Sequence, residues 1–202
     1  MIPMTKLDPV VNFDLFVRPG FFQEDICKNL VTEMRLAERA PATVYGTSSS
    51  GAVNENVRRT LRHTLSQNSV DYVSRRILEY KHEVAKHFSL TLSDCEEPQF
   101  LRYRVGDFFV AHQDGNTGML KLATENRRVS LVIFLNGQSE SPQDDGYCGG
   151  SLVFHDWRVG ARTPPLHMAG DAGTLVAFRS ETTHEVTPVT HGERLSIACW
   201  YV

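Results

Sequence analysis

Apolar residues in the first half of the chain recur at helical spacing in two segments. Residues 23–39 and 69–88 place an apolar side chain every three or four positions, which is typical of amphipathic helices. The run 13–22 is rich in strand-forming residues and is interrupted by Pro19-Gly20. The pattern predicts a strand, a turn and two helices. The apolar positions of the two helices are Ile26, Leu30, Val31, Met34, Val70, Val73, Ile77, Val84 and Phe88.

After residue 98 the periodicity changes to short β-rich runs separated by Gly, Pro, Asn and Asp. Seven such runs following two helices predict an α+β, mainly β chain. The economical way to close so many antiparallel strands is a double-stranded β-helix, or jelly roll, here supported by the N-terminal helices. The runs are FLRYRV, FFVAHQD, RVSLVIFLN, GSLVFHDW, GTLVAFRS, HEVTPV and RLSIACWYV.

The sequence favours one domain over residues 1–202, without internal repeats. Residues 1–98 are predicted to form a helical support region and residues 99–202 the jelly-roll core with the functional site. Two segments are predicted loops. The small, polar stretch 42–56 is a candidate substrate lid, and the acidic stretch 139–146 is a solvated surface turn.

Charge and hydropathy argue against two classes of partner. Lys and Arg number 21 and Asp and Glu 24, the formal net charge is -3, and no run is basic enough to track phosphates, so nucleic acid is not expected. The N-terminus lacks the features of a signal peptide, and no segment has the length of a membrane helix. We expect a soluble cytoplasmic protein, whose oligomeric state the sequence leaves open.

The four cysteines are scattered along the chain and are expected to be free thiols.

His112, Asp114 and His184 are candidate metal ligands. Side chains two positions apart on a strand share a face, so His112 and Asp114 can bind one ion. Two imidazoles and one carboxylate suit ferrous iron and leave coordination positions open for substrate and oxygen chemistry. Arg194 is a candidate anchor for an acidic cosubstrate, because its planar guanidinium fits a carboxylate in two-point contact.

The last two β-rich runs are expected to form a hairpin across the turn THGE. If His184 and Arg194 both face the cavity, Pro188 lies opposite Arg194. Four steps along the strand then cover roughly 13 Å at about 3.3 Å per residue, a gap that a five-carbon dicarboxylate can bridge between metal and guanidinium. The predicted inward side chains are His184, Val186, Pro188, Arg194, Ser196, Ala198 and Trp200.

Five ordered segments carry a family resemblance. They are LRYRVGDFFVAHQD at 101–114, RRVSLVIFLN at 127–136, GGSLVF from Gly149, GDAGTLVAF at 170–178 and HEVTPVTHGERLSIACWYV at 184–202. In these segments the chain resembles the iron(II)/2-oxoglutarate-dependent dioxygenases, specifically the prolyl 4-hydroxylase-like group. The resemblance covers nearly everything from Phe13 onward, and the VRRT segment near Arg58 is also similar to the family's support region.

The resemblance implies that the three candidate ligands bind Fe(II) and that Arg194 binds the distal carboxylate of the cosubstrate 2-oxoglutarate. Tyr103 matches a tyrosine that lines the cosubstrate pocket, and Trp200 matches a tryptophan near the metal. The chemistry implied is hydroxylation of an unactivated C–H bond with O2, while 2-oxoglutarate is decarboxylated to succinate and CO2. Ascorbate is a candidate reductant for the iron.

One departure from the family concerns residues 134–136. Relatives often carry tyrosine in a YLN sequence, whereas this chain has Phe134-Leu135-Asn136. A phenol hydroxyl for the cosubstrate is absent there. Binding of 2-oxoglutarate is therefore expected to lean on Arg194, Tyr103 and Ser196.

Fold and cofactor leave the substrate open. A prolyl residue of a protein or peptide is the first expectation. Because no separate peptide-binding domain is recognised in the sequence, a free amino acid, a small peptide or a biosynthetic intermediate is the alternative. A non-catalytic jelly-roll binding module is disfavoured by the complete ligand set, and a nucleic-acid oxidative demethylase by the lack of a basic run.

Overall fold

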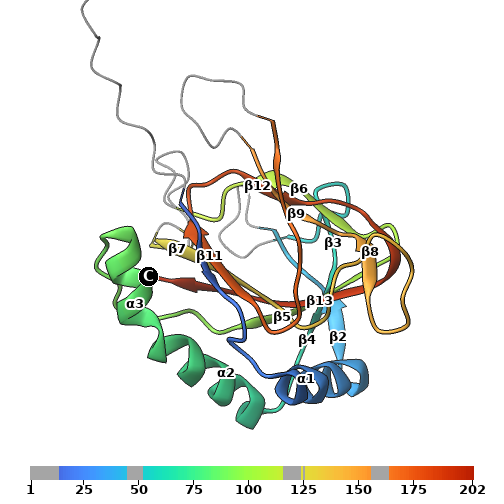
Figure 1. The fold of residues 1–202 in the computed structure, drawn as a ribbon, viewed down its shortest axis with the longest axis horizontal. Helices are drawn as coiled ribbons and strands as arrows, with labels where there is room; N and C mark the ends of the chain where they lie inside the picture. The colour runs from blue at the N-terminus through green and yellow to red at the C-terminus, as the bar shows by residue number, and fades with distance from the viewer. Residues whose placement is uncertain (1–13, 45–51, 116–123, 125, 156–163) are drawn as a thin grey trace, which may run out of the picture.

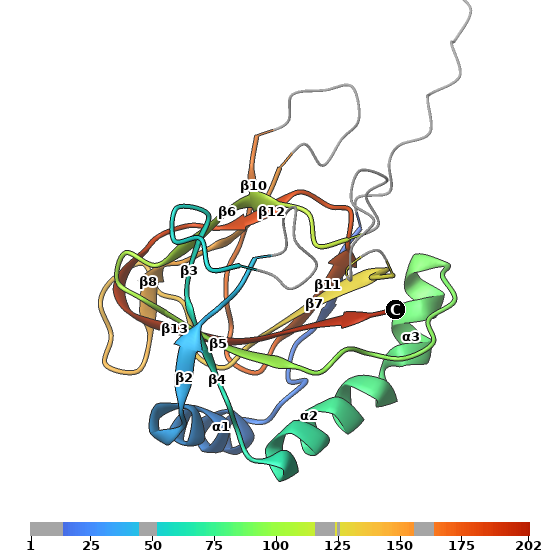
Figure 2. The same ribbon diagram turned by 180° about the vertical axis from the view of Figure 1, so that it is seen from behind.

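The computed structural model describes residues 14–44, 52–115, 124, 126–155 and 164–202. Within them, two antiparallel sheets lie one above the other, and three helices cover the outer face of the larger sheet (Figure 1, Figure 2). This confirms the predicted double-stranded β-helix with N-terminal helices. The centre of the candidate lid, 45–51, lies outside the described residues.

The helices form where the apolar stripes predict them, with two corrections. Helix α1 spans Glu24–Leu36 and ends three residues earlier than predicted. The second predicted helix is two helices, α2 at Gln67–Glu79 and α3 at Lys81–Phe88, which meet at Tyr80. The Ser66 hydroxyl caps α2 by accepting a backbone N–H three residues further on. None of the described helices is long and apolar enough to cross a bilayer.

The larger sheet has the strand order β1-β11-β7-β13-β5-β4-β2, and β8 also pairs with β13. Its long central strand β13 joins β5 on one side to β7 on the other. Its strands are β1 Phe16–Arg18, β2 Arg39–Pro41, β4 Leu61–His63, β5 Gln99–Arg104, β7 Val129–Phe134, β8 Tyr147–Gly149, β11 Leu175–Arg179 and β13 Val189–Tyr201.

The smaller sheet has the order β10-β9-β12-β6-β3. Strands β1 to β4 precede residue 98, so the first half of the chain extends both sheets in addition to supplying the helices. The sequence did not single out β2, β3, β4, β8 or β10, which are only two or three residues long, and it predicted β1 as the longer run 13–22. The strands of this sheet are β3 Arg58–Arg59, β6 Phe108–His112, β9 Leu152–Phe154, β10 Leu166–Met168 and β12 His184–Val186.

The predicted hairpin of the last two strands is wrong. Strand β12 pairs with β6 and β9 in the smaller sheet, whereas β13 pairs with β5, β7 and β8 in the larger one. The THGE residues lie inside β13, where Gly192 adopts a φ of 69° and pairs with Tyr147 of β8. The chain therefore crosses from one sheet to the other between β12 and β13.

Alternation along β13 separates the main core from an interior cavity. One set of its side chains packs under the helices with residues such as Met34 and Ile77; these are Leu195, Ile197, Cys199 and Tyr201. The other set lines the cavity between the sheets: Arg194, Ser196, Ala198 and Trp200. The strand thus anchors the fold with one face and presents functional side chains with the other. All four cysteines are free thiols, as predicted.

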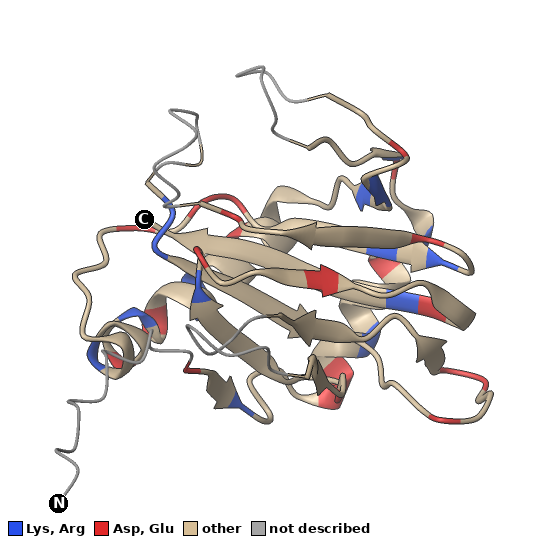
Figure 3. Cartoon of the chain, turned by 90° about the horizontal axis from the view of Figure 1, so that it is seen from above, with Lys and Arg blue, Asp and Glu red and all other residues tan. Residues whose placement is uncertain are grey.

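Acidic and basic residues are interspersed along the described part of the chain (Figure 3). On the larger sheet, Glu193 bridges two arginines, with its carboxylate 2.8 Å from Arg35 Nη2 and 2.6 Å from Arg102 Nη2. This ion-pair network joins α1 to β5 and β13.

Candidate functional site

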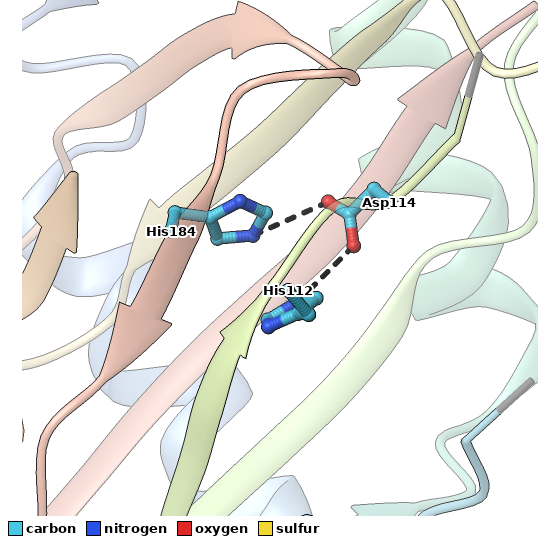
Figure 4. A group of neighbouring side chains, drawn as sticks. All are labelled: His112, Asp114 and His184. Atoms are coloured by element: carbon cyan, nitrogen blue, oxygen red, sulfur yellow. Dashed lines mark ion pairs between the residues drawn. The ribbon is translucent and has the colours of Figure 1, made fainter. Parts of the chain in front are cut away.

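Three side chains with metal-binding atoms meet between β6 and β12. His112 ends β6 and lies directly opposite His184, the first residue of β12. Asp114 follows His112 and points between the two imidazoles (Figure 4). Its Oδ1 lies 3.4 Å from His112 Nε2, and its Oδ2 lies 3.5 Å from His184 Nε2. The ligand atoms all lie within 4.8 Å of one another, so a single ion can contact all three.

Backbone contacts hold Asp114 in this place. The backbone N–H groups of Asp114 and Gly115 both donate to the carbonyl of Ser180, at 2.9 and 3.2 Å. The Gln113 amide donates to the carbonyl of Glu181 at 2.7 Å. These hydrogen bonds connect the segment after β6, which carries Asp114, to the segment before β12, which leads to His184. The same contacts therefore position both ligands.

Both histidines present the same nitrogen to the centre. His112 Nδ1 lies 2.8 Å from the carbonyl of Val110, and His184 Nδ1 lies 2.8 Å from the carbonyl of Thr182. A carbonyl can only accept, so each Nδ1 carries a proton, and in the neutral imidazole Nε2 is then the nitrogen with the lone pair. Backbone carbonyls commonly orient metal-binding histidines in this way.

Electrostatics also favour the ligating protonation states. Burial opposes ionisation of Asp114, but the neighbouring imidazoles of His184 and His112 hold the pKa of its carboxyl well below its usual range. Burial, aided by His112 and opposed by Asp114, lowers the pKa of His184 to about 4. At neutral pH the centre therefore offers an ionised carboxylate and a neutral imidazole, the forms that bind metal. The donor set, its spacing and its free Nε2 atoms fit ferrous iron.

A cavity of about 160 Å³ opens beside this centre. The two sheets contribute opposite walls, so His184 and Arg194 face one cavity although they are not on one hairpin. All five candidate site residues and most of the predicted inward set line it, whereas Pro188 does not. The predicted residues brought together there are His112, Asp114, His184, Tyr103, Arg194, Val186, Ser196, Ala198 and Trp200.

Arg194 is a buried cation, with 2% of its surface exposed. Its Nη1 donates to Ser196 Oγ at 2.7 Å, and its Nε has no hydrogen-bond partner in the part of the chain that the structure describes. Its Cζ lies 5.2 Å from the ring centroids of both Tyr103 and Phe134. Among the described residues no carboxylate pairs with it. A buried guanidinium of this kind is suited to an anionic ligand.

Sequence reasoning missed two further residues of the cavity wall. The Phe109 ring stacks on His112 with centroids 3.5 Å apart, and Arg58 lies over Phe109 with Cζ 4.8 Å from its centroid. Phe109 lies in the predicted strand run FFVAHQD, for which only His112 and Asp114 were singled out, and Arg58 was noted only for the family's support region. Their contact depends on the pairing of β3 with β6, which places Arg58 opposite Phe109. No local signal marks that pairing.

Comparison with known proteins identifies the family. Residues 98–202 match the model of the 2OG-Fe(II) oxygenase superfamily. A PKHD-type hydroxylase of Paracoccus denitrificans is 30% identical over 173 residues, covering 84% of this chain and 71% of that protein. One from Shewanella sp. (strain ANA-3) is 34% identical over 103 residues, covering 51% of this chain and 41% of that protein. The chain thus spans less than half the length of the second relative.

Solved structures share the fold. A Pseudomonas putida prolyl-4-hydroxylase superposes with a TM-score of 0.70 at 24% identity, covering 94% of this chain and 92% of that one. A second structure is a Trichoplax adhaerens prolyl hydroxylase, solved with a peptide fragment of the hypoxia inducible factor oxygen degradation domain. It superposes with a TM-score of 0.71 at 14% identity, covering 93% of this chain and 82% of that one. Together with the matched family model, these findings show that the chain belongs to the 2OG-Fe(II) oxygenase superfamily and shares the fold of the prolyl 4-hydroxylases.

Proposed function

We propose that this enzyme hydroxylates a prolyl residue of a protein or peptide, using Fe(II), 2-oxoglutarate and O2. In this proposal His112, Asp114 and His184 bind the iron, and Arg194, flanked by Tyr103, binds the distal carboxylate of 2-oxoglutarate. The observation that carries it is the convergence of a two-histidine, one-carboxylate cluster and an unpaired buried arginine on one cavity. The prolyl hydroxylase names of the structural neighbours favour the substrate class.

Iron with 2-oxoglutarate and O2 supplies the oxidising chemistry that hydroxylates an unactivated C–H bond while the cosubstrate becomes succinate and CO2. The protein's part is binding, orientation and exclusion of water. Arg194 and Ser196 orient the dicarboxylate from the larger sheet, opposite His184 on the smaller one. Leu101, Leu152 and other apolar side chains of the wall exclude water from the reacting atoms.

The proposal is tested by loading the protein anaerobically with Fe(II) and 2-oxoglutarate, then admitting oxygen with prolyl peptides and ascorbate as reductant. We expect succinate formation to rise when a suitable peptide is present, and that peptide to gain the mass of one oxygen atom. Reactions without 2-oxoglutarate or without iron are the controls. Absence of succinate from every metal-loaded reaction would contradict the enzyme assignment, whereas oxidation of only non-prolyl compounds would contradict the substrate class.

The second candidate substrate is a free amino acid or another small carboxylic acid, and one observation favours it. Arg58 lines the cavity, is 8% exposed and donates from Nη1 to the carbonyl of Thr43 at 3.0 Å. Within the described residues, its Nε has no hydrogen-bond partner and no carboxylate pairs with its guanidinium. A second unpaired cation near His112 suits the carboxylate of the molecule being hydroxylated.

Arg58→Met separates the two candidates. If the substrate carries a carboxylate bound by Arg58, the variant should lose about 2 kcal/mol or more of substrate binding, roughly a thirtyfold drop in kcat/KM. Its affinity for 2-oxoglutarate should stay within about twofold of wild type. N-acetylproline and N-acetylprolinamide form the matched substrate pair, and Arg59→Met, on the same strand, is the control variant because Arg59 is exposed. Equal turnover of the acid and the amide would reject this candidate.

A further inference from the structure

Tyr147 is a buried tyrosine whose hydroxyl proton has no acceptor among the described residues. It begins β8, is fully buried, and no described residue accepts a hydrogen bond from its Oη. Its backbone is held firmly: its N–H donates to the carbonyl of Gly137 at 3.1 Å, and its carbonyl accepts from Ser139 at 2.9 Å. A buried hydroxyl whose proton has no acceptor costs free energy. Because the strand fixes the position of Tyr147, we expect a bound ligand to supply the acceptor.

The polar neighbour of this hydroxyl is the Arg194 guanidinium. Burial raises the pKa of the Tyr147 phenol, and the positive charge of Arg194 together with its hydrogen-bonding contact to the phenol oxygen opposes part of that rise. The phenol therefore keeps its proton at neutral pH. Arginine has only donors, so it cannot accept this proton. Within the described residues, the Tyr147 O–H and the Arg194 Nε–H both lack an acceptor.

Two glycines leave room for this pair of side chains. A Cβ at Gly170 would collide with Tyr147 Oη and lie 2.8 Å from Phe134 Cδ1. A Cβ at Gly150 would lie 3.2 Å from Arg194 Cδ and 3.3 Å from Tyr147 Cδ2. The Tyr147 hydroxyl and the Phe134 ring thus border the same guanidinium. Phe134 occupies the position at which relatives often carry the tyrosine.

We propose that the Tyr147 hydroxyl is a third hydrogen-bond donor to the distal carboxylate of 2-oxoglutarate, beside Arg194 and Ser196. It supplies the phenol that is absent at Phe134. The inference rests on the proposed role of Arg194. Arg194 lines the cavity, and Tyr147, which is not among the lining residues, borders Arg194. In this proposal the carboxylate is seated at the inner end of the cavity, where it can meet both side chains. An ionised carboxylate has lone pairs for all three donors, and bonds to charged groups are the stronger kind.

Tyr147→Phe tests the inference, because it removes one oxygen atom and keeps the ring. The full chain is loaded anaerobically with Fe(II) and titrated with 2-oxoglutarate by calorimetry. We expect the Kd for 2-oxoglutarate to rise about tenfold or more, as for loss of a bond to a charged group. Fe(II) affinity should not change. The thermal midpoint of the ligand-free variant should not fall, since the hydroxyl donates no hydrogen bond to any described residue.

The matched ligand is 2-oxopentanoate, which keeps the keto-acid end but has a methyl group in place of the distal carboxylate. Tyr147→Phe should leave its affinity within about twofold of wild type, and the double variant with Phe134→Tyr should recover part of the lost 2-oxoglutarate affinity. Unchanged 2-oxoglutarate binding in the variant, or equal losses for both ligands, would overturn the inference. Failure of the metal-loaded wild type to bind 2-oxoglutarate would instead reject the proposed function itself.

Discussion

Replacing Asp114 with alanine should remove metal binding and abolish turnover while the fold persists. The variant loses the one carboxylate of the cluster, whose oxygens lie 3.4 and 3.5 Å from the two Nε2 atoms. Loss of an outer-shell partner of a metal ligand typically costs about 10–100-fold in metal affinity or activity, and loss of a ligand should exceed that. Fe(II) affinity by anaerobic calorimetry and succinate formation measure the effect, with circular dichroism to verify folding.

The matched control for Asp114→Ala is Glu185→Gln. Glu185 is an acidic residue beside His184 on β12, but its carboxylate lies 3.2 Å from His155 and outside the cluster. This control should bind iron and form succinate as the wild type does. Oxidation retained by a metal-checked preparation of Asp114→Ala would contradict the ligand assignment.

Replacing Arg194 with methionine should leave iron binding intact and nearly eliminate 2-oxoglutarate binding. Truncating one partner of a buried, hydrogen-bonded charge pair costs about 2–5 kcal/mol, which corresponds to a rise in Kd of roughly 30-fold or more. Arg194→Lys should recover only part of this loss, because lysine keeps the charge but lacks the planar fork that fits a carboxylate. Anaerobic titration of the iron-loaded variants with 2-oxoglutarate measures both effects.

Arg104→Met is the control for Arg194. Arg104 lies on the neighbouring strand β5, opposite Glu193 in the strand register, its side chain forms an ion pair with Asp107, and 56% of that side chain is exposed. Its removal should leave the Kd for 2-oxoglutarate unchanged. If Arg194→Met bound 2-oxoglutarate as tightly as the wild type, another group would have to hold the distal carboxylate, and the inference about Tyr147 would fail with it.

The shared face of His112 and Asp114 could be predicted because it is a local property of the strand. The same holds for β13, where alternation places Arg194 with Ser196 and Trp200 on one face and Leu195 with Ile197 on the other. The helices could be predicted equally well from the spacing of their apolar residues, but the break at Tyr80 between α2 and α3 could not.

Strand pairing was predicted less well. The sequence suggested that His184 and Arg194 meet on one hairpin, whereas they reach the cavity from different sheets. The prediction that both residues face one cavity was correct, although the predicted strand pairing was wrong. Both statements hold because the two side chains point into the cavity in either arrangement. Short strands such as β3 and β8 carried no signal of their own. The positions of Arg58 beside Phe109 and of Tyr147 beside Arg194 consequently could not be predicted before the strand pairing was known.

By itself the sequence determined the face on which each candidate ligand lies, the fold class and, through its motifs, the family. Only the tertiary structure decided which strands are neighbours, and hence that Arg194 is buried beside Tyr147 with no carboxylate of the described residues paired to it. The physical reason is that side-chain direction follows from local backbone geometry, whereas strand partners are selected by packing between residues far apart in the chain.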